Sequence, residues 1–431
     1  MERIQAVRGM NDILPDQVAW WKQVEEVARD VLEAFGFQEI RTPLMEKLEL
    51  FARSIGEGTD IVEKEMYTFT DSKGQLLALR PEATASVVRA YIEHNLRANP
   101  ALRKFYTIGP MFRHERPQKG RYRQFHQIDA EVFGLEDPMV DAEMIYLIDH
   151  LLGQVGLTER RICINTLGCR ICRTTYRKRL QEFLDQRSDE LCPDCQRRRH
   201  INPLRSFDCK VDRCGQVLAE APVIIDALCA QCAEHFQRVQ EYLGMLGVSF
   251  EIDPRMVRGL DYYTRTAFEV ITDRLGAQNA VGGGGRYDGL MRELGGPDLP
   301  AIGFAIGMER LILLLQQERS ISGWHPDIFV AALGTKARQT AFRLVQELRV
   351  QRIATEMDYE GSSLKSQMRR AGKLKVPYVL IIGDDELAEG KAVLRDMEEK
   401  SQVHVPLDEL VPSIVDVVRR YRMKARDSGL K

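Results

Sequence analysis

A chain of 431 residues is too long for one ordinary hydrophobic core, so we expect two or three domains. A content of 44% hydrophobic and 29% charged residues is typical of a globular protein, and no apolar run approaches the roughly 18 residues that would span a membrane. The opening MERIQAVRGMNDILP lacks the apolar segment of a secretory signal, so we expect a cytoplasmic protein whose nine cysteines are free thiols or metal ligands rather than disulfides. With 61 basic and 63 acidic residues, any binding of nucleic acid must come from local patches.

The first part of the chain reads as a helix followed by short strands. Apolar residues recur at helical spacing from Val18 to Phe35, and Gly36 suits the end of that helix. The segment FQEIRTPLMEK predicts a strand that contains Pro43, and a proline inside a strand favours an edge or an interface. Residues 75–79, 104–112 and 127–133 predict further strands. Short strands with helices between them indicate a mixed or antiparallel sheet.

Eight of the nine cysteines lie between Gly168 and Glu251, in a stretch that reads as helical. Strand-like segments return afterwards at residues 266–272 and in VGGGGRYDGL, and an apolar helix is predicted over residues 302–315. The pattern predicts a helical insertion, residues 168–252, that divides a sheet domain into residues 1–167 and 253–322.

The last part of the chain, residues 325–431, predicts a separate α/β domain. The strand-like segments DIFVAAL, RIATEMDY and PYVLIIG alternate with the helical segments ARQTAFRLVQELR and SLKSQMRRAGKLK. This alternation is typical of βαβ units. Basic residues gather in RRAGKLK and RRYRMKAR.

A cationic stretch, FRHERPQKGRYRQFHQ, separates two predicted strands, with PQKG as the turn. It is either a solvated hairpin or a phosphate site. The alternation of the strands places Arg113 on a face of the sheet, where a guanidinium needs a partner anion. The forked donors of arginine suit phosphate oxygens, which favours the phosphate interpretation.

Three other segments offer similar parts. RGLDYYTRTAFE combines Arg258 and Asp261 with two tyrosines, and GFAIGMERL places Glu309 and Arg310 in an apolar run. That acid–base pair is either an internal ion pair or part of a site. The glycines of VGGGG let a ligand approach the backbone closely. No GxGxxG fingerprint or GxxxxGK[ST] motif occurs, so Rossmann and P-loop sites are unsupported.

Together these segments resemble the class II aminoacyl-tRNA synthetases, and among them the histidyl-tRNA synthetases. The cationic stretch looks like motif 2, GFAIGMERL like motif 3, and FGFQEIRTPLME like motif 1, with Pro43 at its dimer-interface proline. RGMNDILP, LRPEATA, RGLDYYTRTAFE and GGGGRYDGL are similar to segments peculiar to the histidyl enzymes. The resemblance covers essentially the whole chain. It implies an antiparallel-sheet catalytic domain with a helical insertion and a C-terminal α/β anticodon-binding domain.

The resemblance also implies an activity and its residues. Histidine would be activated with ATP and Mg²⁺ to histidyl-adenylate, pyrophosphate released, and histidine transferred to the 3′ end of histidine tRNA by a homodimer. Arg113 and Arg258 are the implied catalytic residues at the α-phosphate, and Arg121 and Arg310 would also bind ATP. The implied ligands of L-histidine are Glu82, Thr84, Gln127, Glu131, Tyr262, Tyr263 and Tyr287. For each tyrosine, plain core packing with a satisfied hydroxyl is the alternative.

Two other functions fit the same resemblance. One is a catalytically silent regulatory paralogue that acts in histidine biosynthesis, which would lack the anticodon domain and the catalytic arginines. The other is a pure RNA-binding or sensor module, like the pseudo-synthetase domains of stress kinases. Arg113, Arg258 and Arg310 are all present, and no kinase or effector segment is seen, so both are disfavoured.

The cysteines of the insertion predict one or two structural zinc ions. Cys-x2-Cys spacings are typical of tetrathiolate sites, and zinc would supply folding energy to a small helical segment. The candidate ligands are Cys169, Cys172, Cys192, Cys195, Cys209, Cys214, Cys229 and Cys232. The spacing leaves the combination of the four pairs open, and free thiols at helix ends are the alternative. Cys163 is left over, and we expect it to be buried.

Overall fold

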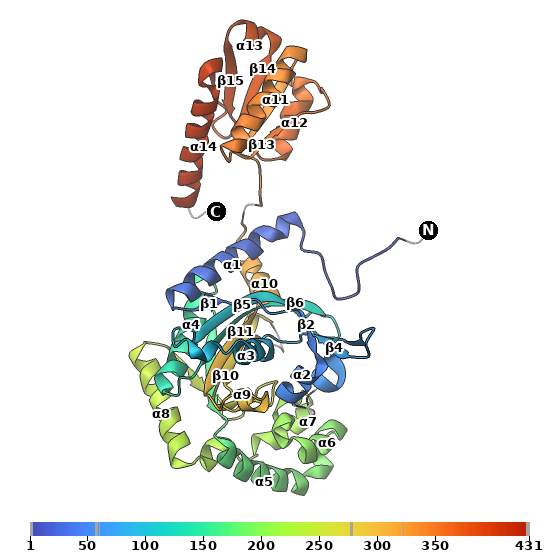
Figure 1. Ribbon diagram of the computed structural model, residues 1–431, viewed down its shortest axis with the longest axis vertical. Helices are drawn as coiled ribbons and strands as arrows, with labels where there is room; N and C mark the ends of the chain where they lie inside the picture. Colours follow the sequence, from blue (N-terminus) through green and yellow to red (C-terminus); the bar gives the residue numbers. More distant parts are fainter. Residues whose placement is uncertain (1–2, 57–58, 60, 276–278, 322, 428–431) are drawn as a thin grey trace. The chain divides into compact units, whose positions relative to one another are not determined.

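The computed structural model describes residues 3–56, 59, 61–275, 279–321 and 323–427 (Figure 1). The chain divides into two compact units, one formed mainly by residues 20–319 and the other mainly by the residues from Ser320 onward. None of the helices in these ranges is long and apolar enough to cross a membrane.

An eight-stranded sheet forms the centre of the first unit. Its order is β1-β5-β6-β11-β10-β9-β7-β8. The strands are β1 (Gln38–Glu39), β5 (Lys104–Phe112), β6 (Gln124–Phe133), β11 (Ala301–Gly307), β10 (Ala280–Arg286), β9 (Thr264–Ile271), β7 (Arg161–Thr166) and β8 (Glu251–Ile252). Neighbouring strands are antiparallel except for the parallel pairs β1–β5 and β7–β8 at the two edges. The predicted antiparallel-rich sheet is confirmed.

The predicted helix over residues 302–315 is wrong in its first half. Residues 301–307 form strand β11, and helix α10 (Met308–Glu318) begins only afterwards. Strand β11 lies between β6 and β10, and Ile302, Phe304 and Ile306 are all buried. A strand in the middle of a covered sheet reads as a continuous apolar run, which periodicity alone does not separate from a helix.

The segment around Pro43 is divided between two sheets. Strand β1 lies at the edge of the large sheet, while β2 (Met45–Lys47) lies at the edge of a three-stranded sheet with β4 (Leu76–Leu79) and β3 (Thr68–Thr70). The predicted single strand is therefore wrong, and the predicted edge position is confirmed. Pro43 falls between the two strands, where no ladder hydrogen bond is required of it.

Helices cover both faces of the large sheet. Helix α4 (Pro138–Gln154) packs on β9, β10 and β11, and α3 (Thr84–Glu93) contributes Val88 and Tyr91 to a core with Phe105 and Phe133. The remaining helices of this part are α1 (Pro15–Ala34), α2 (Leu48–Ile55) and α9 (Leu290–Glu293). Side chains alternate along β6, so Gln127, Asp129, Glu131 and Phe133 share the face that α3 covers.

The predicted helical insertion is confirmed between β7 and β8. Its helices are α5 (Arg170–Gln186), α6 (Pro193–Ile201), α7 (Asp212–Ala219) and α8 (Ala230–Met245), with a 3₁₀ segment, η4 (Pro203–Asp208). They enclose a small core around Tyr176, Leu180 and Leu184. Helix α8 packs against α4, so the end of the insertion returns to the catalytic sheet (Figure 1).

A buried ion pair fixes that return. Arg286, at the end of β10, and Asp141 of α4 are both fully buried, with 2.6 Å between Nη2 and Oδ2. His235 of α8 adds a contact of 3.1 Å from Nε2 to Oδ1 of Asp141. Three elements thus meet at one carboxylate.

The second unit contains a five-stranded sheet in the order β13-β12-β14-β15-β16. The elements are β12 (Ile328–Leu333), α11 (Thr335–Val350), β13 (Thr355–Met357), α12 (Leu364–Lys373), β14 (Tyr378–Gly383), α13 (Asp384–Ala388), β15 (Lys391–Asp396), β16 (Gln402–Pro406) and α14 (Leu410–Asp427). The three predicted strands are parallel, as βαβ units require. The antiparallel β15 and β16 were not predicted.

Candidate functional site

A cavity of about 250 Å³ opens on the α3 side of the large sheet. Ten of the eleven side chains that the sequence predicts for ATP and histidine line it: Arg113, Arg121, Arg258, Arg310, Glu82, Thr84, Gln127, Tyr262, Tyr263 and Tyr287. Glu131 lies directly behind this lining and accepts hydrogen bonds from two of its members. Segments far apart in the sequence therefore meet at one place.

The turn after β5 supplies two of the arginines. The Arg113 N–H donates to the carbonyl of Arg123, and its Nε donates to the carbonyl of Pro81, at 2.9 Å in both cases. Its guanidinium lies 5.1 Å from the centre of the Phe125 ring. Arg121 pairs with the carboxylate of Glu115. Burial lowers the pKa of both arginines, yet both stay cationic because an arginine pKa starts far above neutrality.

Arg258 lies on β9's side of the cavity. Its Nη1 donates to Glu269 Oε1 at 2.7 Å, and its guanidinium lies 5.7 Å from the centre of the Tyr263 ring. Burial alone would lower the pKa of Arg258, but the charges of Tyr263 and Glu269 raise it above its usual value. Gly283 of β10 leaves the room that this guanidinium needs, because a Cβ there would lie 3.0 Å from Nη1.

The first turn of α10 supplies Arg310 and Glu309. Arg310 donates to the carbonyl of Ala280 at 2.7 Å and to that of Gly120 at 3.3 Å, so it joins β10 to the motif 2 turn. Glu309 accepts from the backbone N–H of His126 at 2.9 Å and contacts its ring Nδ1 at 3.0 Å. Glu309 therefore helps to fix β6 beside the cavity.

Buried carboxyls gather at the other end of the cavity. Glu131 accepts from Thr84 Oγ1 at 2.5 Å and from the Tyr287 hydroxyl, and Glu82 accepts from the Ala85 N–H at 3.0 Å. Burial raises the pKa of Glu82, and it raises those of Asp129 and Glu131 well above their usual range. A cationic ligand at this end would favour the ionised carboxylates.

The two ends of the cavity are separated along β6. Phe125, Gln127, Asp129 and Glu131 follow one another on the same face, and an antiparallel strand rises about 3.4 Å per residue, so Phe125 and Glu131 lie roughly 20 Å apart. Between these ends, Gln127 Oε1 and Asp129 Oδ2 are buried without a hydrogen-bond partner among the described residues. Buried acceptors of this kind are normally satisfied, so they point to a ligand that donates hydrogen bonds.

The sequence analysis missed three carboxylates of this cavity, namely Glu115, Asp129 and Glu269. Asp129 carried a usable signal, because it lies between Gln127 and Glu131 at the spacing that places all three on one face of a strand. Glu115 and Glu269 carried none, because their position follows from tertiary packing against Arg121 and Arg258.

The eight candidate metal ligands form two groups of four in the insertion. The first Cys pair meets the fourth, and the second meets the third, which settles the combination that the spacing left open. Cys163 is buried on β7, outside both groups, as predicted.

Comparison with known proteins adds independent information. Residues 9–311 match the histidyl-tRNA synthetase family, and residues 327–416 match the anticodon binding domain family. The chain is 54% identical over 416 residues to the histidine–tRNA ligase of Desulfosudis oleivorans, covering 96% of this chain and 98% of the relative. It is also 54% identical over 404 residues to the histidine–tRNA ligase of Geobacter sulfurreducens, covering 94% and 97%.

Solved structures agree. The crystal structure of apo histidyl-tRNA synthetase from S. aureus has a TM-score of 0.82 and 36% sequence identity, covering 96% of this chain and all of the other. A Bacillus halodurans protein, titled an ATP phosphoribosyltransferase regulatory subunit/histidyl-tRNA synthetase, has a TM-score of 0.65 at 21% identity over 89% of this chain and 100% of that one, which shows the shared fold alone. Taken with the match over residues 327–416, these findings disfavour the regulatory paralogue. The chain belongs to the histidyl-tRNA synthetase family.

Proposed function

We propose that this chain is a histidine–tRNA ligase. It activates L-histidine with ATP to histidyl-adenylate, releases pyrophosphate, and transfers histidine to the 3′ end of its tRNA. One observation carries this proposal: a single cavity presents arginines from three separate segments at one end and buried carboxyls at the other. The first set suits the phosphates of ATP, and the second suits an amino acid with a cationic amino group.

Arg113 and Arg258 are assigned to the α-phosphate, one from each side. The nucleophile, the carboxylate of histidine, is ionised at neutral pH, so the first step needs no general base. It needs positioning and neutralisation of the charge that builds up on phosphorus, which fixed guanidinium groups supply. The contacts of Arg113 with Pro81 and of Arg258 with Glu269 hold both side chains before the substrates arrive.

Arg121 and Arg310 are assigned to the outer phosphates and the nucleotide. Mg²⁺ enters as part of the substrate, bound to the phosphates of ATP. The carboxylates of Glu115, Glu269 and Glu309 line the same cavity and are the hard oxygen ligands that Mg²⁺ prefers. These residues therefore fit a magnesium complex of ATP.

The amino acid is assigned to the end of the cavity around Glu131. Glu82, Thr84, Gln127, Glu131 and the tyrosines 262, 263 and 287 form this subsite. A carboxylate that accepts from an imidazole N–H selects histidine, because a ligand without that donor leaves a buried acceptor unpaired. The bonds from Thr84 and Tyr287 hold the Glu131 carboxylate in one orientation.

The remaining assignments concern the rest of the chain. We assign the anticodon of histidine tRNA to residues 325–431, where the exposed Arg369 and Lys373 of α12 offer cations for phosphates. Residues 1–167 and 253–322 form the catalytic domain around the insertion of residues 168–252. The edge segment around Pro43 is assigned to a homodimer interface, and the compartment to the cytoplasm.

Exchange of pyrophosphate into ATP, run with each amino acid in turn, tests the first step. We expect exchange with histidine alone, and transfer of histidine to its tRNA in a separate charging assay. A folded protein without histidine-dependent exchange would favour the silent paralogue, and exchange with another amino acid would refute the assigned subsite.

A further inference from the structure

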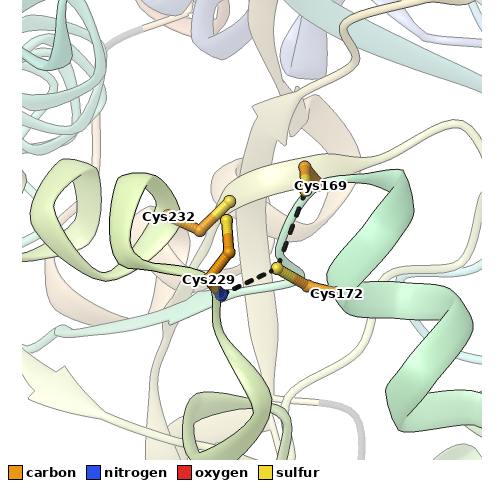
Figure 2. A group of neighbouring side chains, drawn as sticks. All are labelled: Cys169, Cys172, Cys229 and Cys232. Atoms are coloured by element: carbon orange, nitrogen blue, oxygen red, sulfur yellow. Dashed lines mark hydrogen bonds between the residues drawn. The ribbon is translucent and has the colours of Figure 1, made fainter.

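We propose that the insertion binds two structural zinc ions, each held by four cysteine thiolates. The outer cluster is Cys169, Cys172, Cys229 and Cys232, and the inner cluster is Cys192, Cys195, Cys209 and Cys214. In each cluster, all four sulfur atoms lie within 4.8 Å of one another. Figure 2 shows the sulfurs of the outer cluster converging from the start of α5 and the start of α8.

The sulfur separations fit a tetrahedral metal site. Zinc–sulfur bonds of about 2.3 Å imply edges of about 3.8 Å in a tetrahedron of sulfurs. The distance from Cys192 Sγ to Cys209 Sγ is 3.8 Å, and that from Cys169 Sγ to Cys172 Sγ is 3.6 Å. A disulfide needs about 2.05 Å, and all nine cysteines are free.

Both clusters are built on the same local geometry. Cys169, Cys192 and Cys229 are each the N-cap of a helix, and the second cysteine of each pair lies three residues further on, in the first turn. Cys214 has the same position in the first turn of α7. The positive end of a helix dipole stabilises thiolates, the form that binds metal.

The same cross-contact also occurs in both clusters. The N–H of Cys229 donates to Cys172 Sγ at 3.1 Å, and the N–H of Cys192 donates to Cys214 Sγ at 3.2 Å. Second-shell hydrogen bonds of this kind orient metal ligands and balance their charge. The turn before α5 is equally specific, because Gly168 has φ +60° and a Cβ there would lie 2.6 Å from the Cβ of Cys172.

The two clusters anchor the side chains that hold the segment from Arg258 to Tyr263. Arg173, which follows the outer-cluster cysteines on α5, donates from Nη1 to the carbonyl of Tyr263 at 2.8 Å and to that of Asp261 at 3.3 Å. Asn202, between the two inner-cluster pairs, donates from Nδ2 to the Asp261 carboxylate at 2.9 Å. We therefore infer that the zinc sites position the segment that carries Arg258 and the pocket tyrosines. This second step rests on the proposed function.

Metal analysis of the full chain, purified without chelator, tests the sites independently of activity. We expect two zinc per chain in the wild type, one in Cys232→Ser and one in Cys214→Ser. The matched control, Cys163→Ser, removes a buried cysteine outside both clusters and should keep two. Cobalt exchanged into the wild type should show the visible bands of tetrahedral thiolate coordination, which gives a readout that does not depend on how the variants fold.

Less than about 0.2 zinc per chain, with all nine thiols reacting rapidly in the folded wild type, would overturn the proposal. Iron in place of zinc would overturn the identity of the metal. Two zinc in an enzyme without exchange activity would leave the sites standing and refute the proposed function instead.

Arg173→Ala tests the link to the pocket. It should keep two zinc and lower kcat for histidine-dependent exchange by roughly 10- to 100-fold, because the Arg258–Tyr263 segment loses its support. Arg179→Ala, an exposed arginine on the same helix, should change neither quantity. A wild-type kcat in Arg173→Ala would refute the positioning role.

Discussion

Replacing Gly303 by alanine should impair the recognition of histidine. Gly303 of β11 lies opposite Glu131 of β6, and a Cβ built on it would lie 1.7 Å from Glu131 Oε2 and 2.7 Å from the carbonyl oxygen of Ala130. The strand cannot move aside, because β11 is paired with β6 and β10. The carboxylate must therefore rotate away.

The rotation removes the hydrogen bonds from Thr84 and Tyr287 to Glu131. Each is worth about 1 kcal/mol net with neutral partners and about 1.5–3 kcal/mol with a charged one. The loss of both is at least about 2 kcal/mol, which corresponds to a fall of roughly 30-fold or more in kcat/KM for histidine. The phosphate end lies roughly 20 Å away along β6, so KM for ATP should change little.

Steady-state pyrophosphate exchange with histidine and ATP varied separately measures this, beside a thermal unfolding curve. Gly244→Ala, where no atom lies within 4 Å of the added Cβ, is the control and should behave as the wild type. Glu131→Gln keeps the volume of the side chain and should lose histidine selectively even if Gly303→Ala folds poorly. A folded Gly303→Ala protein within about threefold of wild-type kcat/KM would refute the reasoning.

Arg258→Ala should reduce kcat for exchange by at least about 3 kcal/mol of transition-state stabilisation, and a value within a few-fold of wild type would count against its assignment. Arg369→Ala combined with Lys373→Ala should raise KM for tRNA and flatten its salt dependence without changing exchange; unaltered charging would remove α12 from the tRNA interface. Asp141→Asn should lower the free energy of unfolding by about 3–5 kcal/mol in urea titrations, because Arg286 stays buried without its anion. Burial would raise the pKa of Asp141, but Arg286 outweighs it and holds the pKa below its usual value, so the contribution is present above about pH 4 and is lost as the pH falls; a difference between wild type and variant that does not shrink in acid would contradict this.

The sequence predicted those parts of the fold whose pattern is local. Strand β5 was predicted over the range that it occupies, because Lys104–Phe112 is bounded by turn residues and alternates in burial. The residues 302–307 were misread because a strand covered on both faces has no polar alternation. The cysteine spacing identified the ligands without their combination, since a chain can bring the first pair to the second or to the fourth with equal local geometry.

The candidate site was predicted mainly through the family resemblance. Arg113 had a local reason to lie near an anion, but Glu131 and Tyr287 lie in different motifs, and nothing local indicates that the tyrosine donates to that carboxylate. Glu269 illustrates what sequence leaves out, because an acid in an alternating strand reads as solvent-exposed until Arg258 is found beside it.

The contact between Cys172 and Cys229 brings together two points that are 57 residues apart in the chain. Seen from the catalytic sheet, the insertion therefore leaves and returns at nearly one place. The chain entropy of closing a loop grows only with the logarithm of its length, by about 0.6 kcal/mol for each doubling, and a folded lobe with adjacent ends costs the sheet less still. Strands β7 and β9 can then pair almost as if a short turn joined them. The lobe beyond that contact is thus a replaceable module, free to differ in length and in cysteine content among relatives while the sheet beneath it stays the same.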